Sequence, residues 1–256
     1  MLLAVDIGNT NILCGGIVDG QIRHSFRMAT HKDKSAAEYA LQLNDLIRLY
    51  FKDPKALKGA IISSVVPEVT HSIEKAIIET LYLLPVIVKR EIPAPFPIKL
   101  DYPATLGSDR IADATAVLHE YPLPAIIFDL GTATTCSVLN KQGEFIGGLI
   151  SPGIKTGSDA LLSKASLLGS YELSNPEQLI GANTEDAINS GIVYGHASMV
   201  DGLVRRIEKQ FEEKHCVVLT GGLSGLIAQY CECDIIVDRV LILKGLNYLY
   251  HSQKNQ

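Results

Sequence analysis

The sequence predicts an α/β protein made of two similar halves, and three observations lead to this fold class. An apolar run that ends in Asp, an apolar residue and Gly occurs at Asp6 and again at Asp129, about half the chain apart. Each copy opens the same predicted order of elements: three antiparallel strands, a helix, a strand, a helix and a strand. Between the two series, residues 92–97 contain three prolines, which cannot lie in a helix interior or a central strand. We therefore expect the boundary between the halves within residues 90–115.

The elements of the first half follow from its apolar periodicity and its turn residues. They are a hairpin at 2–13, a strand within 15–28 that turns at Asp19-Gly20, a helix at 35–51, a strand at 59–66, a helix at 68–83 and a strand at 85–88. Ser35 with Glu38 matches a capping box and marks the start of the first helix.

The elements of the second half repeat this order. They are strands at 125–130, 133–140 and 143–150, helical segments at 160–168 and 184–213, a strand at 216–220 followed by Gly221-Gly222 and a short helix, a strand at 234–237 and a helix at 239–250. We expect two domains, residues 1–105 and residues 106–256.

The repeated Asp-Gly turn suggests a phosphate site. Glycine lets the backbone approach a ligand closely, and successive turn amides form a concavity that binds anions. The carboxylate of Asp6 or Asp129 then suits the cation that accompanies a phosphate. A single copy would favour an ordinary hairpin with an aspartate at its turn, but two copies could face each other across a cleft and hold the two ends of a polyphosphate.

The composition excludes several classes of function. With 47% hydrophobic residues, a net charge of −5 and a pI near 5.8, the chain has no broad basic surface for nucleic acid. Its start lacks a basic segment typical of a signal peptide, and no apolar run is long enough to span a membrane. The five cysteines are an odd number without the spacing of a zinc site. We expect a cytoplasmic protein without a nucleic-acid or membrane partner.

A polar block lies between the halves, at Gly107-Ser108-Asp109-Arg110. The spaced apolar residues from Ile111 onward predict a helix, so this block would form its N-terminus, where an acidic residue and an anion are both favoured. From these residues alone, Asp109 is either a helix cap or a functional carboxylate.

The paired Asp-Gly hairpins resemble those of the acetate kinase, sugar kinase, Hsc70 and actin superfamily, and the block 105–110 resembles that of the type III pantothenate kinases. Further motifs match this family in order: Ser63–Pro67, Asp129–Thr135, Gly148–Gly153, Gly181–Thr184 with Gly191, and Thr220–Gly222. The resemblance implies a duplicated ribonuclease H-like (actin-like ATPase) fold, with two mixed β-sheets flanked by helices and an interdomain cleft. It also implies the ATP-dependent phosphorylation of pantothenate to 4'-phosphopantothenate, the first step of coenzyme A biosynthesis.

The resemblance also implies residue roles. Asp109 would be the general base, Arg110 a second catalytic residue, Asp6 the ligand of Mg²⁺ through water, and Asp129 the ligand of a monovalent cation, K⁺ or NH₄⁺. The ATP-binding residues would be Asp6, Ile7, Gly8, Asn9, Thr10, Asn11, Ile12, Leu13 and Thr132. The pantothenate-binding residues would be Gly107, Ser108, Asp109, Arg110, Thr184 and Tyr102. Thr184 would act across a homodimer interface, and the apolar residues of the helical region 184–213 exceed what one core face requires.

Some positions depart from the family pattern. Ser108 stands where alanine is common, and Leu100 stands where a pocket tyrosine is common, so Tyr102 is the candidate replacement. The pair Gly221-Gly222 either approaches the adenosine or forms a turn. The alternatives to a pantothenate kinase are another small-molecule kinase of the superfamily and a non-catalytic nucleotide-binding regulator. Retention of all three key aspartates favours the enzyme.

Overall fold

The structure is a computed structural model that describes residues 1–51, 53–164 and 173–253. The chain divides into two compact units, Met1–Glu120 with Leu241–Gln256, and Tyr121–Val240. The sequence predicts a boundary between residues 105 and 106, whereas the units divide after Glu120 and again after Val240. The first unit is therefore discontinuous in the sequence, and the second unit is one continuous stretch.

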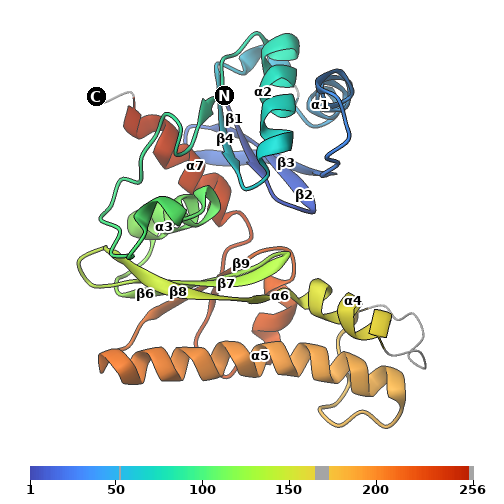
Figure 1. The fold of residues 1–256 in the computed structure, drawn as a ribbon, viewed down its shortest axis with the longest axis vertical. Coiled ribbons are helices and arrows are strands. Elements are labelled where there is room, and N and C mark those ends of the chain that lie inside the picture. Colours follow the sequence, from blue (N-terminus) through green and yellow to red (C-terminus); the bar gives the residue numbers. More distant parts are fainter. Residues whose placement is uncertain (52, 165–172, 254–256) are drawn as a thin grey trace. The chain divides into compact units, whose positions relative to one another are not determined.

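The first unit contains a five-stranded mixed sheet in the order β3-β2-β1-β4-β5 (Figure 1). β1 pairs antiparallel with β2 and parallel with β4. The strands are β1 (Leu2–Ile7), β2 (Asn11–Val18), β3 (Gln21–Ala29), β4 (Gly59–Ser64) and β5 (Val86–Ile87). Asp19 and Gly20 have φ values of 50° and 75°, which confirms the predicted tight turn between β2 and β3.

Two helices, α1 (Ala36–Tyr50) and α2 (Pro67–Leu81), share an apolar core with the sheet. The predicted capping box is confirmed: Ser35 Oγ accepts from Glu38 N at 3.3 Å, and Glu38 Oε2 accepts from Ser35 N at 2.9 Å. Two short 3₁₀ segments, η1 (Pro54–Ala56) and η2 (Pro103–Thr105), lie in the connections of this unit. Side chains at alternate positions of β1 enter this core, so the intervening ones, including Asp6, point to the opposite face.

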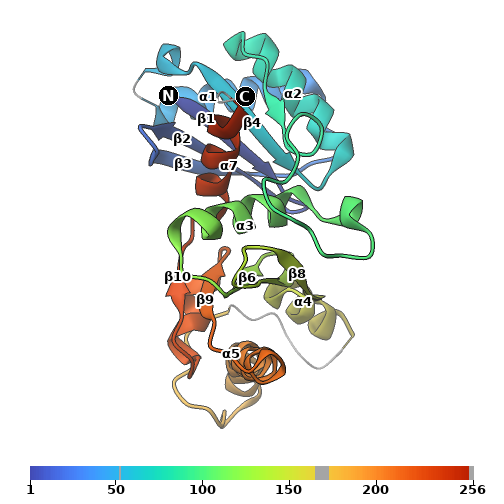
Figure 2. The same cartoon turned by 90° about the vertical axis from the view of Figure 1, so that its left-hand side faces the viewer.

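The helices α3 (Ser108–Glu120) and α7 (Leu241–Ser252) pack against each other, and α7 also contacts β1 and β4 (Figure 2). The packing is so close that a Cβ atom on Gly245 would lie 1.8 Å from Ala112 O. The Glu120 carboxylate accepts from Lys244 Nζ at 2.7 Å and from Tyr248 OH at 3.1 Å. These contacts explain why the last helix of the chain belongs to the first unit.

The second unit contains a five-stranded sheet in the order β10-β9-β6-β7-β8. Its strands are β6 (Ala125–Leu130), β7 (Ala133–Leu139), β8 (Phe145–Pro152), β9 (Cys216–Thr220) and β10 (Ile236–Val237). Read from β8, this order repeats that of the first sheet, with the first strand of each unit at the centre. β6 also pairs antiparallel with the next strand and parallel with β9. The predicted duplication and fold class are confirmed.

The helices of the second unit are α4 (Ile154–Lys164), α5 (Thr184–Phe211), α6 (Ser224–Ile227) and the 3₁₀ segment η3 (Ala228–Tyr230). α4 begins earlier than the predicted segment 160–168, of which residues 165–168 lie outside the described residues. One face of the 28-residue helix α5 packs on the sheet through buried residues such as Val193 and Val200. In the described parts of the chain, no helix is both long and apolar enough to cross a membrane.

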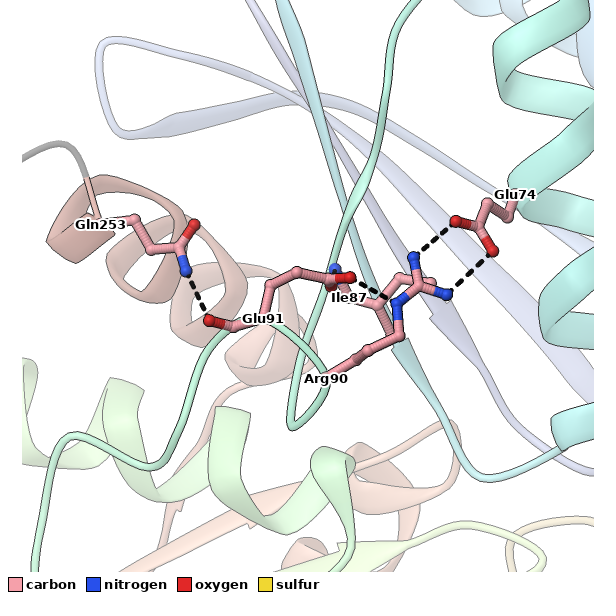
Figure 3. Close-up of polar contacts among 5 residues, drawn as sticks. All are labelled: Glu74, Ile87, Arg90, Glu91 and Gln253. Carbon is pink, nitrogen blue, oxygen red and sulfur yellow. Dashed lines mark hydrogen bonds and ion pairs between the residues drawn. The ribbon is translucent and has the colours of Figure 1, made fainter.

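A polar network fixes the loop after β5 (Figure 3). The Arg90 guanidinium donates to both carboxylate oxygens of Glu74, with Nη1–Oε2 at 3.1 Å, and also to Glu91 Oε1. Glu91 accepts from Ile87 N through its other oxygen, and its carbonyl accepts from Gln253 Nε2 at 2.8 Å. The hydrogen bonds from Arg90 hold the pKa of Glu74 below its ordinary value. The network therefore ties α2, β5 and the end of α7 together.

Candidate active site

The first Asp-Gly hairpin is fixed by backbone contacts from outside its own turn. Asp6 is half-buried near the end of β1, and Gly8 N donates to Asn11 O at 3.0 Å to close the turn. Thr30, which follows β3, donates from Oγ1 to Gly8 O at 2.7 Å and from N to Thr10 O at 3.0 Å. Nothing in the local sequence pattern identifies Thr30, because its contact depends on the pairing of β2 with β3. The turn presents exposed polar residues on a fixed backbone, which suits a phosphate-binding loop.

The second Asp-Gly hairpin places its carboxylate at the equivalent position. Asp129 is half-buried near the end of β6, as Asp6 is on β1. The neighbour on the adjoining parallel strand carries a hydroxyl in both units: Asp6 lies beside Ser63, and Asp129 beside Thr220. Residues paired in register point to the same face of a sheet. Each unit therefore combines one carboxylate with one buried hydroxyl residue.

The turn of the second hairpin rests on the start of α4. Gly131 N donates to Ala133 O at 3.1 Å, and Thr132 is exposed. The Thr132 carbonyl accepts from Gly153 N at 3.1 Å and from Thr156 Oγ1 at 2.6 Å. A Cβ atom on Gly153 would lie 2.4 Å from that carbonyl oxygen, so only glycine fits. The turn is thus anchored by Gly153 and Thr156, which the sequence does not single out for this role.

Gly221 lies directly against the carboxylate of Asp129. Its φ is 94°, and a Cβ atom there would lie 2.7 Å from Asp129 Oδ1 and 2.6 Å from Leu130 O. A Cβ atom on Gly222 would have no heavy atom within 4 Å. Gly221 is therefore required by a contact inside the second unit. Gly221 also begins a turn, because its carbonyl accepts from Ser224 N at 3.3 Å.

Cys14 is a packing residue behind the first hairpin. It is fully buried on β2, and burial together with the nearby Asp6 carboxylate raises the pKa of its thiol. The thiol therefore stays neutral and acts as a small apolar group.

The polar block forms the N-terminus of α3, as predicted. Asp109 is half-buried, and its Oδ1 accepts from Arg110 N at 2.8 Å. A Cβ atom on Gly107 would lie 2.2 Å from this oxygen, so the carboxylate folds over Gly107 and would have to move if a side chain were present there. In the part of the chain that the structure describes, no donor reaches Asp109 Oδ2. One oxygen therefore accepts from an N–H of the first turn of α3, while the other can face a ligand.

Ser108 differs from its neighbours because its side chain points into the unit. It is 3% exposed, and its Oγ is hydrogen-bonded to Ser63 and Ser64 on β4. The sequence places Ser108 among the substrate-binding residues. Its hydroxyl is instead bound inside the protein.

Lys89 holds the segment that leads into the polar block. Its Nζ donates to Ala104 O at 2.8 Å and to Leu106 O at 2.7 Å. Its φ is 71°, which is uncommon for a residue other than glycine. The sequence offers no signal for this role because a single lysine in a loop is typical of a solvated surface. Lys89 thus holds the backbone before Gly107 through Leu106 O, and the Ser108 hydroxyl holds the residue after it.

The two remaining predicted substrate residues are exposed, and they lie in different units. Tyr102 precedes η2 in the first unit and is 75% exposed, with its carbonyl accepting from Thr105 Oγ1 at 2.7 Å. Thr184 is the first residue of α5 in the second unit, directly after Asn183, which caps this helix through a 2.9 Å bond from Asp186 N.

Comparison with known proteins gives consistent results. A family model described as type III pantothenate kinase matches residues 2–206. The chain is 40% identical over 253 residues to a type III pantothenate kinase from Halalkalibacterium halodurans, covering 98% of both chains. It is 38% identical over 250 residues to a type III pantothenate kinase from Moorella thermoacetica, again covering 98% of both.

Solved structures with a similar fold are more distant in sequence. A Campylobacter jejuni protein described as a Baf family transcriptional activator has a TM-score of 0.61 at 19% identity, covering 99% of this chain and 100% of that one. Component A of the (R)-2-hydroxyglutaryl-CoA dehydratase of Acidaminococcus fermentans has a TM-score of 0.59 at 13% identity, covering 100% and 99%. At these identities the similarity concerns the fold alone.

Proposed function

The chain belongs to the type III pantothenate kinase family, and we propose that Asp109 is the general base of its reaction. The protein phosphorylates pantothenate to 4'-phosphopantothenate with ATP, the first step of coenzyme A biosynthesis. The reaction requires a carboxylate that can take the proton of the attacking hydroxyl. The observation that supports Asp109 is its geometry: Arg110 N binds Oδ1, and Oδ2 has no donor among the described residues.

ATP and its divalent cation fit the first hairpin. Mg²⁺ is usually bound by one or two carboxylates together with substrate phosphates and water, and the half-buried Asp6 supplies one carboxylate beside an exposed turn. When bound, the ion neutralises charge on the phosphates. The residues proposed to bind ATP are Asp6, Ile7, Gly8, Asn9, Thr10, Asn11, Ile12, Leu13 and Thr132.

Pantothenate carries a carboxylate and hydroxyl groups. The planar fork of Arg110 suits either this carboxylate or the transferred phosphoryl group. The residues proposed to bind pantothenate are Gly107, Asp109, Arg110, Tyr102 and Thr184, with Ser108 acting only through its main chain. Tyr102 and Thr184 are both exposed and therefore accessible to a ligand.

We also propose that Asp129 binds a monovalent cation, K⁺ or NH₄⁺. The close contact with Gly221 fixes this carboxylate, and Thr220 lies beside it on β9. Oxygen ligands from carboxylate, hydroxyl and backbone suit a hard cation.

A homodimer is part of the proposal, although the support differs from the sequence argument. Ile192, Val193, Val200, Val204 and Ile207 of α5 are buried in the core of their own unit, so they supply no surplus for a partner. The dimer is better supported by exposed apolar residues of the second unit, which include Leu149, Ile150, Leu161, Leu179 and Ile180. A cavity of about 230 Å³ also opens between α4 and α5. It is lined by Gly157, Ser158, Leu161, Gly191, Ile192, Gly195, His196 and Met199.

A cytoplasmic location is likewise a proposal. The five cysteines are free thiols, as expected in a reducing compartment. A non-catalytic regulator gains no support from the Campylobacter jejuni protein, because its similarity concerns the fold alone.

Substitution of Asp109 by asparagine tests the proposal. Asparagine can accept from Arg110 N and caps a helix about as well as aspartate, but it cannot take a proton. We expect Asp109→Asn to keep its melting temperature while kcat, measured as ADP release with pantothenate, falls by about 10²- to 10⁴-fold. The control is Glu68→Gln, which removes a charge from the first turn of α2 and should leave kcat unchanged. A folded Asp109→Asn protein within threefold of wild type would show that Asp109 is only a cap. ADP release with pantetheine or simple sugars as acceptors, but not with pantothenate, would show a different small-molecule kinase.

A further inference from the structure

We propose that Ser108 is a positioning residue: its buried hydroxyl fixes Asp109 relative to the strands that carry Asp6. This inference rests on the proposed function, because it assigns Ser108 an effect on the rate that passes through Asp109. Ser108 stands immediately before Asp109 and is the first residue of α3. The hydroxyl contacts a different element of the fold, so its role is more than capping its own helix.

The hydrogen-bonding capacity of this hydroxyl is fully used. Ser108 Oγ donates to Ser64 O at 2.8 Å, and it accepts from Ser64 N at 3.0 Å and from Ser63 Oγ at 3.1 Å. A serine hydroxyl has one donor and two acceptor sites, so no site remains for a substrate. The exposed fractions of Ser108 and Ser63 are 3% and 0%. The bond between the two serine hydroxyls is therefore buried, where losing it is costly, and the two bonds to Ser64 are half-buried.

The three bonds of Ser108 end on β4, the strand that pairs with β1 beside Asp6. In the parallel pairing of β1 with β4, Asp6 lies opposite Ser63, so the two side chains point to the same face. Ser63 in turn donates to Ser108, which adjoins Asp109. The pairing of β1 with β4 and the buried bond from Ser63 to Ser108 thus link the position of Asp6, the proposed Mg²⁺ ligand, to that of Asp109, the proposed general base.

The partner segment on β4 is itself held rigidly. Ser64 Oγ accepts from Val66 N at 3.0 Å and from Thr70 Oγ1 at 2.6 Å, and Thr70 Oγ1 also lies 2.9 Å from Val66 O. The junction between β4 and α2 is therefore cross-linked by hydroxyls. A catalytic group is placed most precisely when its support is a rigid element with satisfied hydrogen bonds.

Removing the hydroxyl should loosen the first turn of α3. Asp109 is otherwise fixed there by a bond to the adjacent residue Arg110, which moves with it. A misplacement of about 1 Å can cost about 10²-fold in rate. Alanine is common at this position in the family, but in this chain three hydrogen bonds join the Ser108 hydroxyl to β4. For Ser108→Ala, whose helix remains packed on α7, we expect kcat to fall by about 10-fold, with the KM for ATP nearly unchanged.

The chain offers a matched control on the same helix. Thr115 is 1% exposed, and its hydroxyl donates to Ile111 O of its own helix at 2.7 Å. Thr115→Val removes a buried hydroxyl without touching β4, so it should lower stability but leave kcat within twofold of wild type.

A double-mutant cycle separates positioning from a general structural role. We expect Ser108→Ala to lower kcat in the wild-type background. In the Asp109→Asn background it should lower kcat by less than a further twofold, because the base that it would displace is already absent. The inference would be overturned if Ser108→Ala reduced kcat by the same factor in both backgrounds, or if its kcat lay within twofold of wild type. If Ser108→Ala does not fold, Ser63→Ala, which removes only one of the three bonds, is used in the same cycle with the same criteria. Asp109→Asn with wild-type kcat would instead overturn the proposed function.

Discussion

The contact between Gly221 and Asp129 leads to a prediction about a single methyl group. In Gly221→Ala, the new Cβ atom would lie 2.7 Å from Asp129 Oδ1 and 2.6 Å from Leu130 O. Real Cβ atoms essentially never approach other atoms below 3.0 Å, so the carboxylate or the backbone must move. The φ of 94° adds strain for any residue with a side chain.

The magnitude follows from these two contributions. Left-handed backbone costs a residue with a Cβ atom about 1–2 kcal/mol. Overpacking a close contact costs about 1–3 kcal/mol more. We expect the free energy of unfolding to fall by about 3 kcal/mol, which lowers the melting temperature by about 6–12 °C in a protein of this size. A displaced Asp129 should also raise the K⁺ concentration required for half-maximal activity.

The neighbouring glycine provides the control. Gly222 has open space at its Cβ position and no positive φ, so Gly222→Ala should change the free energy of unfolding by less than about 0.5 kcal/mol. Both variants are measured by thermal and urea denaturation, and their activity is titrated with K⁺ in choline buffer. A Gly221→Ala protein that melts like Gly222→Ala and keeps the wild-type K⁺ response would refute the reasoning.

Two further predictions concern pH and assembly. Because Arg90 lowers the pKa of Glu74, the ion pair stabilises the folded state above the ordinary pKa of 4.5 and loses this effect as the pH falls through the lower folded value. Glu74→Gln should therefore cost about 1 kcal/mol at pH 7, a value reduced by the exposure of Arg90, and less at pH 3. An equal cost at both pH values, measured by urea denaturation, would contradict this. For the proposed homodimer, light scattering should give about twice the 27.8 kDa chain mass at micromolar concentration, and an active protein at the single-chain mass would exclude it.

The sequence predicts the fold well because its strongest signals are local. The repeated apolar-Asp-apolar-Gly pattern identifies the central strand of each unit, and the identical strand orders follow from the repeated element order. The capping box of Ser35 with Glu38 and the turn at Asp19-Gly20 each join residues that are close in the sequence. Both motifs can therefore be recognised from the sequence alone.

The sequence fails where a contact joins distant positions. Lys89 is separated in the chain from the carbonyls it binds, and Thr30 reaches the first turn only through strand pairing. Nothing in residues 241–252 indicates that this helix packs on α3 and so belongs to the first compact unit. Ser108 looks like a substrate ligand beside Asp109, and only the burial of its hydroxyl shows otherwise.

The discontinuity of the first unit affects how the protein is made on the ribosome. The N-terminal hairpin emerges first, but its sheet cannot be covered by α7 until Leu241–Ser252 has been translated. The second unit, Tyr121–Val240, emerges as one piece and can complete its core earlier. During synthesis, the unit encoded first is thus the last to be finished. Nascent β1 and β4 would expose to chaperones the apolar face that α7 later covers.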